Sequence, residues 1–211
     1  MTWQLAHDLL ANLGSASPTN PFADSSGNPG VWHMMFSSGL SYDPKTFGDI
    51  PTWDLNLDFA CGARAPGYSC WLFEDSAGAL AQAGMNTSSA TLSGYTCAPY
   101  QVIKPYTAVV HPGPANLVLF GWQSPIAGTV SVGASFVDDD CGGGDGIEWL
   151  VELAQAGNVV LMGSGAFANC GQSTTQFETT MTVGDYLYFI VNPKGDYGYD
   201  LTEVDVAVTC K

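Results

Sequence analysis

The sequence predicts an all-β protein, an antiparallel β-sandwich or jelly roll that forms a single domain over residues 1–211. Three observations lead to this prediction. Short segments in the second half alternate between apolar and polar residues, which is the pattern of strands with one buried face. Turn-forming Gly, Pro and Asn residues separate these segments. Helical periodicity is scarce, and neither a composition break nor an internal repeat marks a second domain.

The expected strands of the second half follow one another closely. In residues 129–137, Val130, Val132 and Phe136 point to one face and small or polar residues to the other. Apolar residues at Trp149 and at the neighbouring alternate positions repeat the pattern in residues 147–153. We expect strands within residues 117–122, 129–137, 147–153, 177–183, 186–191 and 204–210.

The first half is less regular. Residues 4–13, QLAHDLLANL, are the best helical candidate, although this segment can equally open as a strand. Residues 15–30 are rich in Ser, Pro, Asn and Gly and are expected to form a loop. Residues 50–105 are expected to be an irregular, cysteine-containing loop region with short strands at most.

Charge limits the possible partners. The chain has 5 basic and 20 acidic residues, for a formal net charge of −15. Nucleic acid is excluded as a partner because its phosphates would be repelled, and an anionic membrane surface is disfavoured for the same reason. No segment is long and apolar enough to span a membrane. The hydrophobic content of 46% suffices for a core, while the charged fraction of only 12% is typical of many secreted β proteins.

The six cysteines indicate the cellular compartment. Their even number in a Gly- and Ser-rich, Lys-poor chain favours disulfides and an oxidising environment, so we expect a secreted, extracellular or cell-surface protein. No signal peptide is visible at the start, so we expect a mature form. Zinc is not expected, because no CxxC or CxH spacing is present. The favoured pairing is Cys61–Cys70, Cys141–Cys170 and Cys97–Cys210.

The stretch DDDCGGGDGIEW at residues 138–149 is a candidate calcium site. Calcium takes about 6–8 oxygen ligands, and a Gly-rich loop offers carbonyl oxygens beside the carboxylates. The spacing is not that of an EF-hand, so ligands would come from several loops. The alternative is a solvated turn that the Cys141 disulfide holds in place. If calcium binds, the expected ligands are Asp138, Asp140 and Asp145, together with Asp200 or Asp205.

Three segments of the second half carry a resemblance to a known kind of module: HPGPANLVLFGWQSPIAGTVSVGASFVDDD, GDGIEWLVELAQAGNVVL and MTVGDYLYFIVNPKGDYGYDLTEVDVAV. Together with NPGVWHMMF at residues 28–36, they resemble a carbohydrate-binding-module-like β-sandwich that recurs in exported bacterial proteins. That module often lies beside glycoside hydrolases or polysaccharide lyases. The match covers residues 111–210 well and omits residues 50–105. The resemblance implies a non-catalytic, carbohydrate-associated jelly roll.

Aromatic residues suggest where a sugar would bind. Trp32, Trp122 and Trp149 fall on apolar strand faces and are expected in the core. Trp53 and Trp71 lie in the irregular region, between polar and cysteine-rich stretches. They either form a stacking surface for sugar rings or cover the core beneath long loops. The tyrosines that would complete such a surface are Tyr68, Tyr95 and Tyr100.

The resulting functional hypothesis is recognition of an extracellular polysaccharide without chemistry of its own. One alternative is a structural or adhesion subunit whose edge strands or loops bind a protein partner. A second alternative is a secreted glycan-active enzyme. The chain has no GxSxG motif, and the carboxylate pairs Glu148/Glu152 and Asp54/Asp58 are accounted for by a solvated sheet face.

Overall fold

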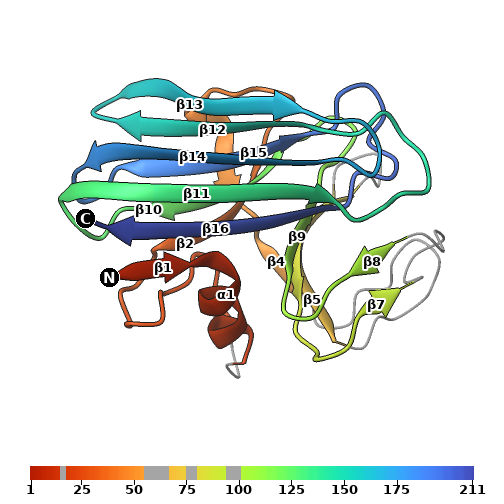
Figure 1. Cartoon of the computed structure of the whole chain (residues 1–211), viewed down its shortest axis with the longest axis horizontal. Helices are drawn as coiled ribbons and strands as arrows, with labels where there is room; N and C mark the ends of the chain where they lie inside the picture. The colour runs from red at the N-terminus through yellow and green to blue at the C-terminus, as the bar shows by residue number, and fades with distance from the viewer. Residues whose placement is uncertain (15–17, 55–66, 75–79, 94–100) are drawn as a thin grey trace.

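The computed structural model describes residues 1–14, 18–54, 67–74, 80–93 and 101–211. These residues form an antiparallel β-sandwich of an eight-stranded and a six-stranded sheet, with a two-stranded ribbon at one end (Figure 1). The ribbon consists of β7 (Leu92–Ser93) and β8 (Val102–Ile103). The predicted fold class is confirmed.

The larger sheet connects strands that are distant in the sequence. Every strand pair in it is antiparallel. Across the sheet the order is β14 (Gln172–Met181), β11 (Gly128–Asp138), β16 (Thr202–Cys210), β9 (Ala108–His111), β6 (Leu80–Asn86), β5 (Tyr68–Glu74) and β4 (Thr52–Asp54), while β1 (Thr2–Gln4) pairs with β16 off this path.

The smaller sheet is also antiparallel throughout. It covers the inner face of the larger sheet. Its order is β13 (Asn158–Ala166), β12 (Glu148–Gln155), β15 (Tyr186–Asn192), β10 (Val118–Gln123), β2 (Trp32–Ser37) and β3 (Phe47–Asp49).

The strands expected in the second half are present as β10, β11, β12, β14, β15 and β16. The interpretation of residues 50–105 as irregular is wrong for its described part, because β5 and β6 have seven residues each and belong to the larger sheet. The two strands approach each other closely at one position. A Cβ atom on Gly84 of β6 would lie 2.5 Å from the carbonyl oxygen of Ser69 in β5, so only glycine fits there.

The segment 4–13 contains both elements that the sequence allowed. The strand β1 ends at Gln4, and the helix α1 (Leu5–Leu13) follows directly. Leu5 and Leu9 on its buried face are fully enclosed in the main core. Among the described residues, no helix is long and apolar enough to cross a membrane. A 3-10 turn, η1 (Pro44–Thr46), precedes β3.

The core between the sheets is rich in indole rings. Trp32, Trp122 and Trp149 are at most 3% exposed, which confirms their predicted place in the core. The ring of Trp149 stacks on Phe136 with 4.8 Å between centroids. It also lies flat against Gly165 of β13, where a Cβ atom would come within 2.8 Å of the indole nitrogen.

Two buried aspartates hold the N-terminal segment against this core. The Trp32 Nε1 donates to Asp8 at 2.9 Å, and the Trp3 Nε1 donates to Asp24 at 2.7 Å. Asp8 also accepts from the backbone N–H of Ser25 at 2.9 Å. These carboxylates satisfy donors that would otherwise be buried without a partner.

The Asp8→Ala substitution should therefore lower the free energy of unfolding by about 2–4 kcal/mol, because each buried donor left without an acceptor costs about 1–3 kcal/mol. Urea denaturation measures this change. The control is Asp43→Ala, which removes an exposed cap of η1 and should cost about 1 kcal/mol or less. Equal losses in the two variants would contradict the assigned role of Asp8.

Candidate functional site

The expected stacking surface around Trp71 is not exposed in the structure. Tyr68 and Trp71 on β5 are 3% and 2% exposed. Trp71 packs into the main core on one face of the strand, whereas Tyr68 packs with Leu92 and Ile103 of the two-stranded ribbon on the other. Because both faces of β5 are covered, neither ring is available to a sugar. The side chain of Trp53 and all of Tyr95 and Tyr100 lie outside the described residues.

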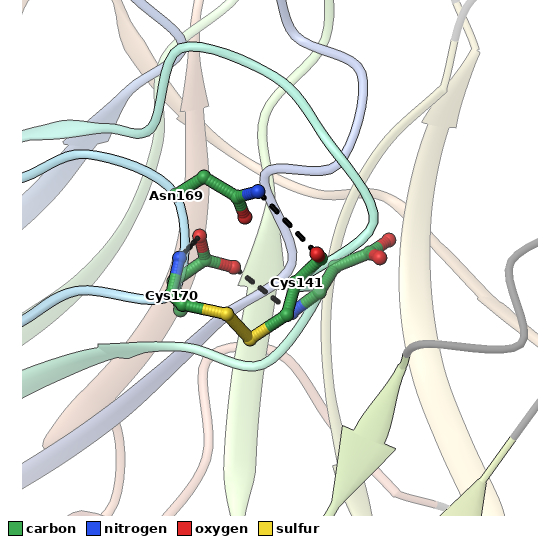
Figure 2. Close-up of a disulfide and its surroundings, with 5 residues drawn as sticks. Cys141, Asn169 and Cys170 are labelled. Atoms are coloured by element: carbon green, nitrogen blue, oxygen red, sulfur yellow. Dashed lines mark hydrogen bonds between the residues drawn. A yellow bond between two sulfur atoms is a disulfide. The ribbon is translucent and has the colours of Figure 1, made fainter.

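The acidic stretch closes one end of the sandwich, where β11 ends and β16 begins. The predicted Cys141–Cys170 disulfide is present there, and Asn169 donates to the Cys141 carbonyl at 3.4 Å (Figure 2). The carboxylate of Asp138 accepts from the backbone N–H groups of Cys170 and Asp140, at 2.8 and 2.9 Å. Asp138 therefore fastens the two disulfide-linked loops to the end of β11.

Of the other two predicted disulfides, one does not form and one lies outside the described residues. Cys210 has a free thiol, so the expected Cys97–Cys210 bridge does not form in the structure. The strand β16 carries Cys210 away from the acidic end, to a position opposite Val130. Cys61 and Cys97 lie outside the described residues, and so does the expected Cys61–Cys70 pair.

Asp200 is the least solvated carboxylate at the acidic end. Its side chain is 0% exposed, and neither oxygen has a hydrogen-bond partner. Burial, followed by the negative charges of Asp145, Asp138 and Asp196, raises its pKa to about 8 against the opposing effect of Lys194. A proton or a bound cation would each relieve the cost of this buried charge.

Asp139, which directly follows β11, is a second carboxyl group with a raised pKa. Burial, followed by the charge of Glu203, raises its pKa to about 8. Lys104 opposes this shift, but its Nζ already pairs with Glu203 at 2.7 Å. One oxygen of Asp139 is buried without a hydrogen-bond partner. The acidic end therefore contains two carboxyl groups that favour the protonated form near neutral pH.

The structure brings together only part of the expected calcium ligand set. Asp145 lies near Asp200 and accepts from the N–H of Gly195 at 3.1 Å. Asp140 accepts from the Gln101 side chain at 2.7 Å. Asp205 lies further along β16, opposite Ser135, and is not among the charges that act on Asp200. No group of three His, Cys, Asp or Glu side chains that could hold a metal occurs in the described part of the chain.

A second candidate site, which the sequence analysis missed, lies on the outer face of the smaller sheet. Leu187, Phe189 and Val191 of β15 point into the core, so Tyr186 and Tyr188 point outward. We call the outward group formed by Tyr186, Tyr188, His33, Asp49 and Glu152 the tyrosine face. The sequence signal was the alternation in YLYFIV, which places two tyrosines on the face opposite the core.

Hydrogen bonds and ring contacts order the tyrosine face. The rings of Tyr186 and Tyr188 are stacked, with 5.3 Å between centroids. The His33 Nδ1 lies 2.9 Å from an Asp49 oxygen, and a carboxylate only accepts, so Nδ1 carries the proton. The His33 Nε2 lies 3.4 Å from the Tyr186 hydroxyl, so the two side chains contact each other through polar atoms as well as through their rings.

Glu152 lies beside this tyrosine pair in the same row of the sheet. It is paired with Tyr188 in the ladder, while Gly121 separates Tyr188 from His33. Glu152 is 7% exposed, and its Oε2 is buried without a hydrogen-bond partner. Burial raises its pKa. The expectation that a solvated sheet face accounts for Glu152 is therefore wrong, because the neighbouring side chains exclude water from it.

Further polar groups border the tyrosine face. The Tyr42 hydroxyl donates to Glu148 at 3.0 Å, and the side chain of Asn192 donates to the Tyr42 oxygen. Glu148 is thus held by hydrogen bonds at the border of the tyrosine face. Of the other predicted pair, Asp58 and the side chain of Asp54 lie outside the described residues.

Comparison with known proteins finds distant likenesses among solved structures. No protein-family model matches the sequence, and no curated protein matches it. Among solved structures, similarity extends to the C-terminal CBM6 of LamC from Zobellia galactanivorans, at 11% identity and a TM-score of 0.28 over 66% of this chain and 87% of that one. CBM51 from Clostridium perfringens GH95, in complex with methyl-galactose, is 14% identical, with a TM-score of 0.36 over 56% of this chain and 79% of that one. Murine APRIL is 9% identical, with a TM-score of 0.29 over 46% of this chain and 85% of that one.

These likenesses concern the β-sandwich alone, since the TM-scores are low and the matched proteins differ in kind. They include two carbohydrate-binding modules and murine APRIL. The choice of a ligand therefore rests on the side chains of this chain.

Asp139 and Asp200 should make the protein less stable as the pH rises. Their folded-state pKa values of about 8 exceed the ordinary value of 3.8, so the folded protein holds more protons than the unfolded chain between these values. Their contribution to stability is complete below about pH 4 and is lost as the pH rises to about 8. Asp139→Asn and Asp200→Asn should each flatten this decline in urea unfolding measured with a chelator.

The matched control is Asp185→Asn, because hydrogen bonds from Thr182 and Gln155 lower the pKa of Asp185 against the effect of burial. This variant should reduce stability without changing the slope between pH 5 and about 8. An unchanged slope in both the Asp139 and Asp200 variants would show that these groups ionise normally.

Proposed function

We propose that the protein is a secreted, non-catalytic β-sandwich module that binds an extracellular polysaccharide through the tyrosine face. The carrying observation is the half-buried ring of Tyr186, which stacks on Tyr188 and whose hydroxyl lies 3.4 Å from the His33 Nε2. Pyranose rings present C–H groups that pack on aromatic rings, and hydroxyls that hydrogen-bond carboxyl and phenol oxygens. On the tyrosine face the half-buried Tyr186 presents its ring, whereas Tyr188, which stacks on it, and Glu152 are only 6% and 7% exposed.

The charge of the protein favours a neutral glycan. A net charge of −15 repels chains that carry sulfate or carboxylate groups. Asp49, whose side chain is 36% exposed, places further acceptor oxygens within the site itself. Sugar hydroxyls can donate to these oxygens, whereas an anionic ligand cannot.

Secretion forms part of the same proposal. Disulfides such as Cys141–Cys170 persist in oxidising compartments. The space outside the cell, where the protein would meet a polysaccharide, is such a compartment. The low charged fraction of 12% is in keeping with an exported β protein.

The Tyr186→Ala substitution tests the proposed site. Affinity electrophoresis against soluble β-glucan, xylan, mannan, galactan and starch should show retention of the wild-type protein by at least one of them. Loss of the Tyr186 ring removes a stacking surface worth about 1.4 kcal/mol, so we expect roughly tenfold weaker binding. Thermal unfolding verifies that the variant is folded.

The matched control is Tyr197→Ala, which removes an exposed tyrosine near His111, away from the tyrosine face. Binding should be unaffected. If Tyr197→Ala abolishes retention and Tyr186→Ala does not, the glycan site lies at the acidic end instead.

If the whole panel fails to retain the protein, the assembly alternative is favoured. The edge strand β13 is uncharged and exposes Val159, Val160 and Leu161, so it would then be the expected contact with a protein partner.

Calcium binding at the acidic end is a separate proposal, supported by the buried and unpartnered carboxylate of Asp200. The other carboxylates are partly engaged, so carbonyl oxygens of the Gly-rich loop 142–146 would complete the usual shell of about 6–8 oxygens. Asp145, which acts on Asp200 electrostatically, is the second residue that would hold the ion. A bound cation would keep Asp200 ionised in place of a proton.

Calcium in the millimolar range should therefore raise the melting temperature at pH 8, by an amount that corresponds to roughly 2.7 kcal/mol at a hundredfold excess over Kd. Magnesium should have a smaller effect because it requires a tighter octahedral shell. Asp200→Asn should abolish the response, while Asp205→Asn, on the outer face of β16, should retain it. If the melting temperature of the wild type is the same in calcium and in chelator, calcium does not bind, and Asp200 is neutralised by protonation alone.

A further inference from the structure

The outer face of the larger sheet has a shallow groove with a volume of about 390 Å³. It crosses β14, β11 and β16, which run side by side in Figure 1. The inner faces of the two sheets share one core, so this groove and the tyrosine face lie on opposite sides of the sandwich. The side chains that line it are Gly133, Ser135, Thr174, Gln176, Asp205 and Ala207.

The strand pairing explains the hollow. Val132 and Phe136 of β11 point into the core, so Gly133 lies on the outer face, between Gln176 of β14 and Ala207 of β16. A Cβ atom on Gly133 would meet no other atom within 4 Å. Two small residues therefore form the floor, and the longer side chains beside them form the walls.

The walls of the groove are chemically suited to a ligand rich in hydroxyl groups. The next row of the sheet places Ser135 between Thr174 and Asp205. In the described part of the chain, the side chains of Ser135, Thr174 and Gln176 make no hydrogen bond within the protein, so their donors and acceptors face the groove. None of the described lining residues is basic, and Asp205 would repel an anion.

We infer that this groove is a second glycan-binding site, and that one molecule therefore bridges two polysaccharide chains. This inference rests on the proposed function of the tyrosine face. Packed sheets lie about 10 Å apart, and the two sites face away from each other, so one straight chain segment cannot occupy both. Binding at both faces thus adds a cross-linking activity to simple retention.

The test uses the soluble polysaccharide that retains the wild-type protein most strongly in the panel above. Mixing the two should produce turbidity that rises and then falls with the protein-to-glycan ratio, as expected of a bivalent cross-linker. Gly133→Leu fills the groove from its open floor and should abolish the turbidity. The same variant should still be retained in affinity electrophoresis through the tyrosine face. Asp205→Asn should reduce the turbidity.

The matched control is Thr129→Leu, which places the same side chain on the outer face of β11, outside the groove. It should cross-link as the wild type does. Retention of the wild type without turbidity, or full turbidity with Gly133→Leu, overturns the second site and leaves the proposed function intact. Failure of the wild type to bind any glycan in the panel overturns both.

Discussion

The pleat of the strands over one shared core is the constraint on which the rest of the molecule depends. Once Leu187 and Phe189 pack inward, Tyr186 and Tyr188 have to face outward, because successive side chains of a strand alternate between the two faces. The same rule on β11 places Gly133 outside when Val132 is buried. A slip of one residue in either strand would exchange the core with a candidate ligand surface.

Burial has opposite consequences for two groups of acidic side chains. Near the N-terminus, Asp8 and Asp24 accept from tryptophan Nε1 and backbone donors, so their negative charge is compensated. At the acidic end, Asp200 and Asp139 have unpartnered oxygens and raised pKa values. The first pair secures the fold, whereas the second makes the loop end responsive to protons and, in our proposal, to calcium.

The sequence allowed the second half of the fold to be predicted because its strands bury one face and expose the other. The same reasoning failed for β5, which is covered by the core on one side and by Leu92 and Ile103 on the other, so that it shows no clean alternation. It also passed over β13, where Val159, Val160 and Leu161 are apolar in succession and all exposed.

The candidate site was only partly foreseeable. Tryptophans suggested a sugar surface at Trp71, yet large aromatic rings contribute most to stability when buried, and this one lies in the core. The pattern YLYFIV predicts a strand with two tyrosines on one face, but these tyrosines were not assigned to a site in the sequence analysis. Their partners could not be predicted, because the His33–Asp49 contact arises when β2 pairs with β3, and Glu152 meets Tyr188 only when β12 pairs with β15.

The central claim is that glycan recognition uses the outward faces of the sandwich rather than the aromatic residues of its core. Amide chemical shifts of the ¹⁵N-labelled protein, followed during titration with an oligosaccharide cut from a bound polysaccharide, test this claim most directly. The account predicts shifts centred on β15, β12 and β2 around Tyr188, with a second group around Gly133 on β11. Shifts confined to β4 and β5 around Trp53 and Trp71, with neither outer face affected, would contradict it.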